Sequence, residues 1–149
     1  SSRDPRVVAS SHLLGIILLW PEVADPAING ITDGMLDEQF SELYRNLLIF
    51  YNDTRHTVPQ KKFIARFENG ADRHFYERVL ALEMLAEKEY GGLAVNERSA
   101  VVKALVAQLR KLHLGSRQRE LVEAMASAEK AGDAERIRQI QQRIDELIF

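Results

Sequence analysis

Cysteine is missing from the 149-residue sequence. A chain without thiols cannot form a disulfide scaffold, a thiolate zinc site or a cysteine nucleophile. The absence is compatible with a reducing compartment, and we expect a cytoplasmic protein. The chain starts at Ser1 rather than at methionine, which predicts a piece excised from a longer protein.

Long apolar runs are also missing. The longest, from Leu13 to Trp20, has eight residues, whereas a helix needs about 20 apolar residues to span a bilayer. No basic segment precedes this run, as it would in a signal peptide. We therefore expect no membrane association.

Catalytic and cofactor motifs are absent from the sequence too. It has no Gly-rich phosphate loop, no Ser-His-Asp arrangement and no nucleophile elbow. The best metal-like spacing joins His74 and Glu77, but di-iron bundles need a Glu-x-x-His pair on each of two helices. We expect no metal, no cofactor and no enzymatic activity in this chain.

Charge of one sign does not dominate, and the net charge is −2. Residues 1–95 hold 10 Lys and Arg against 14 Asp and Glu, and residues 96–149 hold 10 against 8. This split into −4 and +2 is too mild for a dedicated nucleic-acid surface. We expect no direct binding of nucleic acid.

The sequence does contain apolar residues that recur at the 3.6-residue period of a helix. No stretch alternates convincingly between apolar and polar residues, as a strand would. A first helix is predicted to start at Asp4-Pro5, because Asp caps a helix and proline suits its first position. It should end at Trp20, since the residue before a proline avoids the helical region. Apolar residues surround most of this helix, which places it centrally in a bundle.

Further elements of the bundle follow from turn signals and apolar spacing. A loop is predicted at residues 25–30, which contain Asp-Pro and Asn-Gly pairs. Helices are expected at about residues 36–51, from residue 59, and at about residues 72–90. The inner faces of the last two are predicted to carry Phe63, Ile64 and Phe67, and Phe75, Val79, Leu82, Met84 and Leu85.

The last third is predicted to be one long helix that starts at an N-cap, Asn96. Residues 115–120 have nothing to bury, and beyond them the apolar stripe resumes about 180° around the axis, at ~100° per residue. We therefore predict a boundary inside this helix, with residues 1–114 as a bundle, residues 115–149 as a helical hairpin and Gly115 as a hinge. The first stripe is Val101, Leu105, Leu109 and Leu112, and the second is Leu121, Met125 and Ala128.

A helical turn is predicted at Gly132 and Asp133, because glycine adopts positive φ beyond a helix end and Asp caps the next helix. The returning helix is expected to pack against the second stripe. A two-helix unit of this length is marginal alone, so it must borrow stability from the long helix, from a copy of itself or from a partner. Its seam has the narrow spacing of a coiled coil: Ile137, Ile140, Ile144 and Leu147.

Both ends of the chain resemble a known family. The segment Leu13–Ala24, LLGIILLWPEVA, resembles the opening helix and Pro-Glu turn of the C-terminal helicase-interaction domain of bacterial DNA primase. The segment Ala128–Leu147 is similar to the tail of that domain, where a Gly-Asp turn joins two charged helices. Between residues 52 and 90 only helical character matches, and Trp20 departs from the polar residue of the family.

The resemblance implies an all-α, non-catalytic domain that binds the replicative helicase. The parent would be a DNA primase with a zinc-binding segment and an RNA-polymerase core, neither of which this chain contains. The bundle would modulate helicase activity, and the hairpin would dock on the N-terminal domains of the helicase hexamer. The contact residues of the family vary between lineages and do not carry over individually. Large apolar side chains near basic ones are typical of binding hot spots, which predicts contacts on the exposed sides and end of the hairpin: Arg136, Gln139, Arg143, Ile144, Leu147, Ile148 and Phe149.

Alternatives stay open. The N-terminal domain of the replicative helicase shares the opening motif. A self-associating bundle is the competing interpretation, in which a bend at Gly115 straightens and sends the hairpin to a neighbouring copy as a domain-swapped dimer. A small helical enzyme ranks third, and a metal or cofactor in the purified protein would indicate it.

Overall fold

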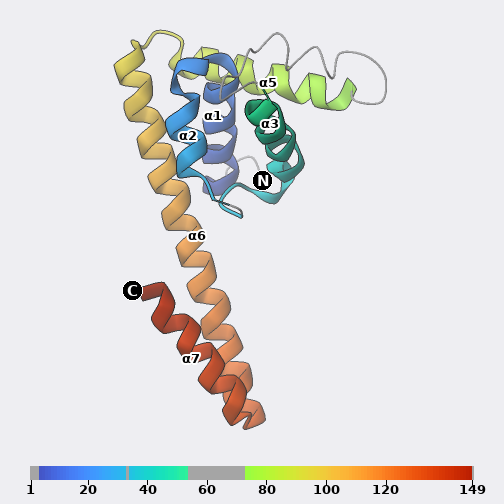
Figure 1. The fold of residues 1–149 in the computed structure, drawn as a ribbon, viewed down its shortest axis with the longest axis vertical. Coiled ribbons are helices and arrows are strands. Elements are labelled where there is room, and N and C mark those ends of the chain that lie inside the picture. The colour runs from blue at the N-terminus through green and yellow to red at the C-terminus, as the bar shows by residue number, and fades with distance from the viewer. Residues whose placement is uncertain (1–3, 33, 54–72, 149) are drawn as a thin grey trace. The chain divides into compact units, whose positions relative to one another are not determined.

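The computed structural model describes residues 4–32, 34–53 and 73–148. Every regular element within these ranges is a helix (Figure 1), so the all-α prediction is confirmed. The chain divides into two compact units, Ser1–Leu109 and Arg110–Phe149, which we call the bundle and the hairpin. The sequence placed this division a few residues later, between residues 114 and 115.

Helix α1, Pro5–Leu19, has the limits that the sequence predicts. The Asp4 carboxylate accepts a hydrogen bond from the Arg6 amide at 2.9 Å, and the Trp20 amide donates to the Ile16 carbonyl oxygen at 2.9 Å where the helix ends. Buried residues surround the helix, which confirms its central place in the bundle. They are Ala9, Ser10, Leu13, Leu14, Gly15, Ile16, Ile17 and Leu18.

The loop predicted at residues 25–30 is wrong, because this segment forms helix α2, Ala24–Gly30, after a 3-10 turn at Pro21–Val23. Pro26 lies in the first turn of α2, where its missing amide hydrogen leaves no bond unmade. Ala27 and Ile28 are buried. Burial of this apolar side therefore outweighs the local turn signals.

Helix α3, Ser41–Asp53, begins later than predicted. Residues 34–37 form a connection that Arg6 holds to α1, with its guanidinium donating to the carbonyl oxygens of Met35 at 3.1 Å and Leu36 at 3.2 Å. Asp37 then caps a 3-10 turn, Glu38–Phe40. The backbone carbonyls of this connection therefore bond to a side chain instead of to helix amides. The helix predicted from residue 59, with Phe63, Ile64 and Phe67, lies outside the described residues.

Helix α5, Arg73–Tyr90, packs closely against α1 at Gly15. A Cβ atom on Gly15 would lie only 2.3 Å from the Leu82 carbonyl oxygen and 2.9 Å from the Ala86 Cβ. Leu82 and Ala86 are buried. Met84 is 73% exposed, so its predicted inward position is wrong. It lies two residues from Leu82, about 200° around the helix.

Helix α6, Val95–Ala131, supplies residues to both units. The Glu97 carboxylate accepts a hydrogen bond from the Ala94 amide at 2.9 Å, while Asn96 lies inside the first turn. The prediction that Asn96 is the N-cap is therefore wrong. Arg98 fixes this end of the helix, because its guanidinium lies 4.2 Å from the ring centroid of Trp20 and 3.4 Å from the Glu22 carboxylate.

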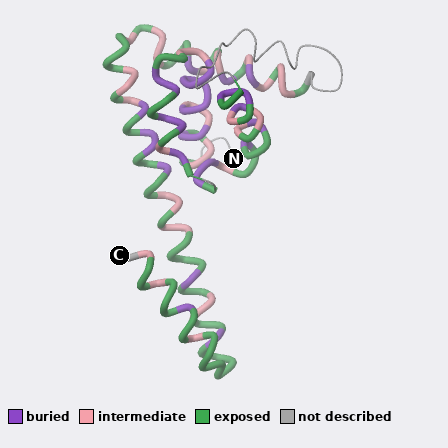
Figure 2. Tube along the Cα trace, in the orientation of Figure 1, coloured by how far each residue is buried: buried purple, intermediate pink, exposed green. Residues whose placement is uncertain are grey.

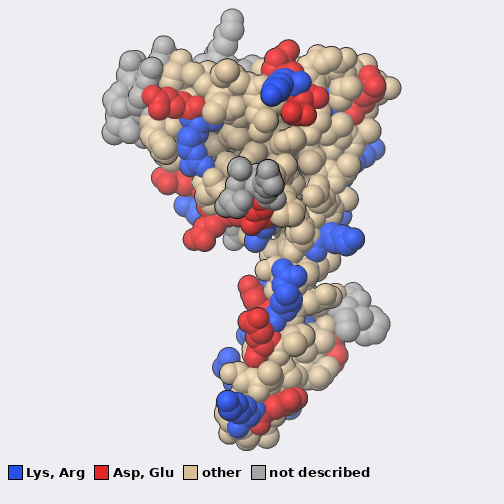
Figure 3. All heavy atoms as spheres, turned by 180° about the vertical axis from the view of Figure 1, so that it is seen from behind, with Lys and Arg blue, Asp and Glu red and all other residues tan. Residues whose placement is uncertain are grey.

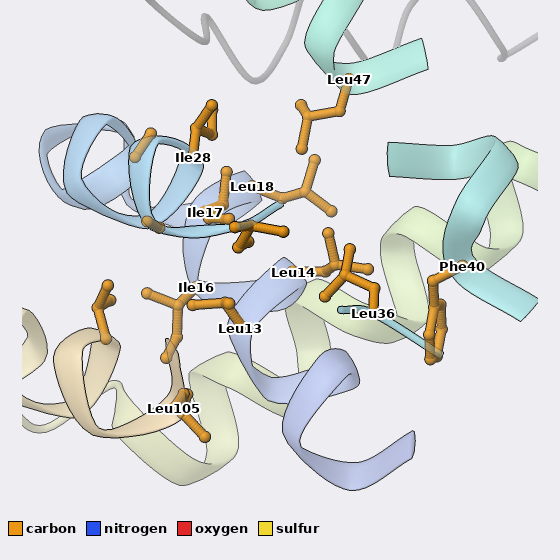
Figure 4. Close-up of a cluster of buried hydrophobic side chains, with 14 of the residues drawn as sticks. Leu13, Leu14, Ile16, Ile17, Leu18, Ile28, Leu36, Phe40, Leu47 and Leu105 are labelled. Carbon is orange, nitrogen blue, oxygen red and sulfur yellow. The ribbon is translucent and has the colours of Figure 1, made fainter. Parts of the chain in front are cut away.

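The bundle core gathers around α1. Figure 4 shows α1 side chains directed toward Ile28 of α2, Leu47 of α3 and Leu105 of α6. Leu105 and Leu109 of the predicted first stripe are buried, whereas Val101 and Leu112 are only partly covered. The sequence missed the other two buried residues of this face, Val102 and Val106.

Tyr51 of α3 gives the bundle a dependence on alkaline pH. It is buried and its hydroxyl donates to the Asp25 carboxylate. Burial raises its pKa to about 12, and the hydrogen bond and the negative charge of Asp25 contribute. The unfolded chain releases this proton at pH ~10. Stability from Tyr51 is therefore complete below pH ~10 and is lost as the pH rises toward the folded-state pKa.

We expect the free energy of unfolding to fall between pH ~10 and ~12, as measured by urea titrations at several pH values. Tyr51→Phe should be less stable at neutral pH and should lose part of this alkaline slope. An unchanged slope in Tyr51→Phe would show that other groups cause the dependence.

Candidate partner-binding hairpin

The turn of the hairpin is built as the sequence predicts. Gly132 has φ +68° and its amide donates to the Glu129 carbonyl oxygen at 3.1 Å, while the Asp133 amide donates to that of Ala128 at 3.1 Å. These two bonds form a Schellman motif. The Asp133 carboxylate accepts from the Arg136 amide at 3.1 Å, which caps helix α7, Ala134–Ile148. The turn therefore fixes where α6 ends and α7 begins.

Substituting Gly132 should test this turn. Gly132→Ala is expected to destabilise the hairpin by about 1 kcal/mol, because an L-residue with a Cβ is disfavoured at positive φ. Nothing lies within 4 Å of the added Cβ, so the cost is conformational and not steric crowding. Gly132→Asn should cost less, since asparagine tolerates this region. Equal thermal midpoints for the wild type, Gly132→Ala and Gly132→Asn, measured by circular dichroism, would contradict the positive φ assigned to Gly132.

The two helices of the hairpin share a small apolar seam. Leu121, Ala128 and Ile140 are its buried residues, and the rest of the surface is mostly exposed (Figure 2). The predicted pairing of the second α6 stripe with the α7 seam is confirmed. Five further side chains are partly buried there: Ala124, Met125, Ile137, Ile144 and Leu147.

The residues predicted to bind a partner fall into different environments. Arg136, Gln139 and Arg143 are exposed on α7, at the i, i+3 and i+7 spacing of one helix face. Within the described part of the chain, neither arginine side chain has a hydrogen-bond or ion-pair partner. The side-chain amide of Gln139 donates to the Glu135 carboxylate at 3.4 Å. Ile144 and Leu147 are partly buried in the seam.

The last two residues predicted to bind a partner, Ile148 and Phe149, lie at the end of the chain. Ile148 closes α7, but its side chain and the whole of Phe149 lie outside the described residues. Their contribution to binding stays a prediction.

Gly115, the predicted hinge, lies within α6, which is helical on both sides of it. Its role as a hinge stays a prediction.

The sequence interpretation missed a hollow on the hairpin. It has a volume of about 250 Å³ and is lined by Gln118, Leu121, Val122, Ile144 and Leu147. Val122 is 63% exposed. The signal was present in the sequence, because Val122 is an apolar residue that follows Leu121 and falls outside the stripe of the seam.

Charges of both signs cover the hairpin, as the view from behind shows (Figure 3). Arg138 pairs with Glu135 at 2.5 Å, and Arg117 pairs with Glu120 at 3.4 Å. Such exposed pairs stabilise a helix only slightly. Arg117 and Arg138 therefore each have an ion-pair partner, whereas Arg136 and Arg143 have none among the described residues.

Residues 4–32, 34–53 and 73–148 contain no group of three or more His, Cys, Asp or Glu side chains able to hold a metal ion. In these ranges no single helix is long and apolar enough to cross a membrane, and α1 with Pro21–Gly30 reaches that apolar length only as a pair bent by 117°. No family model matches the chain, and comparisons with curated proteins and solved structures also give no match.

Proposed function

We propose that this chain is a non-catalytic helicase-interaction domain of a bacterial DNA primase. The hairpin would bind the N-terminal domains of the replicative helicase hexamer and so couple RNA primer synthesis to DNA unwinding. The proposal rests on the resemblance of the opening helix and of the Gly132-Asp133 tail to that family. It needs no cofactor in this chain and no direct contact with nucleic acid.

The observation that carries the proposal is the small core of the hairpin. Among the described residues, the two helices meet over a seam with three buried side chains, Leu121, Ala128 and Ile140. Helices of this length are marginal in water, and most helix stability in proteins comes from tertiary packing. A folded unit with so little packing is typical of a surface that gains stability when a partner covers it.

The exposed face of α7 offers suitable binding groups. Arg136 and Arg143 carry guanidinium groups without partners among the described residues, and each can form paired hydrogen bonds with a carboxylate. Arginine is enriched among the residues that dominate binding energy at protein interfaces. We therefore expect acidic residues on the helicase opposite this face.

Reversing the charge of these arginines tests the proposal. The double variant Arg136→Glu, Arg143→Glu is expected to weaken binding to the helicase at least ~100-fold, because two favourable charge pairs become repulsive. Isothermal titration calorimetry with the helicase from the same cell measures the change. Arg138→Glu is the control on the same helix, since Arg138 already pairs with Glu135. Equal affinity of the double variant and the wild type would contradict this assignment.

Self-association is the second candidate function, and exposed Val122 beside the hollow is the observation that favours it. Light scattering over a range of concentrations separates the two candidates. A monomer at high concentration would exclude the domain-swapped dimer and leave the helicase proposal in place.

A further inference from the structure

The bundle has a hollow of about 240 Å³ beside helix α3. Part of its wall is apolar and comes from Ile31 and Leu36, which precede α3, and from Leu48 of α3. The α3 residues of the wall are spaced i, i+3, i+4 and i+7, so they share one face of the helix. They are Ser41, Tyr44, Arg45 and Leu48. We call this surface the α3 hollow.

Hydrogen bonds hold the connection that forms the other wall of the α3 hollow. The Arg6 guanidinium donates to the three successive carbonyl oxygens of residues 34–36. The Asp37 amide donates to the hydroxyl of buried Ser10 at 3.0 Å. Gly34, which lines the hollow, has φ +84°, a conformation that glycine adopts readily. The hollow is therefore formed before any ligand arrives, as most small-molecule sites are.

Hydrogen-bond donors line the α3 hollow without good acceptors. The Tyr44 hydroxyl is buried and has no hydrogen-bond partner within the described residues. The Thr32 amide donates at 3.1 Å to the Sδ atom of Met35, and a thioether is a weak acceptor. The exposed Arg45 guanidinium has no ion-pair or hydrogen-bond partner in the described part of the chain. A buried hydroxyl without a partner costs free energy, and a ligand that accepts its proton would recover that cost.

These features define the chemistry of an occupant. Arg45 is the one charged residue among the described residues that line the hollow, and none of them is Asp or Glu. A matching ligand is therefore an oxygen anion, and a carboxylate can form paired hydrogen bonds with a guanidinium. A cavity of about 150 Å³ holds benzene, so the α3 hollow has room for one aromatic ring and a carboxylate.

We propose that the α3 hollow is a binding site for a small aromatic carboxylate. The carboxylate pairs with the Arg45 guanidinium and accepts a hydrogen bond from the Tyr44 hydroxyl. The ring packs among Ile31, Leu36 and Leu48. This site lies in the bundle and involves neither the hairpin nor a helicase, so it goes beyond the proposed function and stands or falls separately from it.

The test is an amide NMR titration of the full 149-residue chain with benzoate as the probe. Saturable shifts are expected for Thr32, Gly34 and Ser41, with a Kd of about 1 mM. Arg45→Gln and Tyr44→Phe should each weaken binding at least ~10-fold, because each removes a hydrogen bond to a charged group. Arg136→Gln, an exposed arginine of α7 outside the hollow, is the matched control and should bind benzoate like the wild type.

Two further measurements separate a binding role from a structural one. Tyr44→Phe should keep the thermal midpoint of the free chain, because its hydroxyl has no described partner to lose. Benzyl alcohol, a neutral molecule of similar shape, should bind at least ~10-fold more weakly than benzoate.

The inference is wrong if benzoate gives no saturable shifts, or if the shifts map outside the α3 hollow. It is also wrong if benzyl alcohol binds as tightly as benzoate, or if both hollow variants bind like Arg136→Gln. Weaker benzoate binding by a Tyr44→Phe chain of unchanged thermal midpoint supports it. None of these results depends on whether the chain binds a helicase.

Discussion

Ile140→Asp is expected to unfold the hairpin and to remove helicase binding. Ile140 is 5% exposed and is one of the three seam residues between α6 and α7 that are buried in the described part of the hairpin. A buried carboxylate without a partner costs about 3 kcal/mol or more, and the small seam has few other contacts to offset that loss. Leu121 and Ala128 would lose their packing partner, so α7 should separate from α6.

Limited proteolysis and circular dichroism measure this result. Trypsin should cut Ile140→Asp rapidly at Arg136 and Arg143, with a loss of helical signal that corresponds to α7. Gln142→Asp adds the same charge at an exposed position of the same helix and should resist trypsin like the wild type. A protease-resistant Ile140→Asp that still binds the helicase would contradict the role given to the seam.

Gly15→Ala is expected to be among the most damaging substitutions in the bundle, at about 3 kcal/mol. The new methyl would lie 2.3 Å from the Leu82 carbonyl oxygen and 2.9 Å from the Ala86 Cβ. A backbone atom cannot swing aside as a flexible side chain does, so α1 and α5 must move apart. Their separation would loosen the packing of the buried residues on both helices.

Urea unfolding of the two variants and the wild type measures this cost. Gly92→Ala is the matched control, because nothing lies within 4 Å of its added Cβ, and it should change stability little. A midpoint for Gly15→Ala equal to that of Gly92→Ala would show that the α1–α5 contact is looser than described.

Much of the fold could be predicted because local chemistry decides the helix ends. Asp4 and Pro5 start α1, and Trp20 followed by proline ends it, without help from distant residues. The Gly132-Asp133 turn is likewise local, since its hydrogen bonds join residues within five positions of each other. Such signals need no knowledge of tertiary structure.

The errors arose where tertiary contacts decide the outcome. Residues 25–30 carry turn pairs, yet burial of Ala27 and Ile28 makes them helical. The predicted start at residue 36 failed because Arg6, about thirty positions earlier, binds the carbonyls of Met35 and Leu36. These long-range contacts leave no mark in the local apolar spacing.

The candidate site shows the same division. The seam follows from the helical spacing of apolar residues, and the turn follows from the position of Gly132, so the sequence indicates both. The hollow beside Val122 does not follow from them, because it depends on how Ile144 and Leu147 of α7 lie beside Gln118 and Val122 of α6. Whether Arg136 or Arg143 has an ion-pair partner also depends on side-chain geometry that the sequence does not contain.

The most direct test of the hairpin's role is a comparison of helicase binding by the whole chain and by a chain that ends at Asp133. This truncation removes α7 and leaves the bundle and all of α6. We predict saturable binding of the whole chain to the helicase N-terminal domains and no measurable binding of the truncated chain, with the bundle still folded by circular dichroism. Equal affinity of the two chains would show that the hairpin does not bind the helicase.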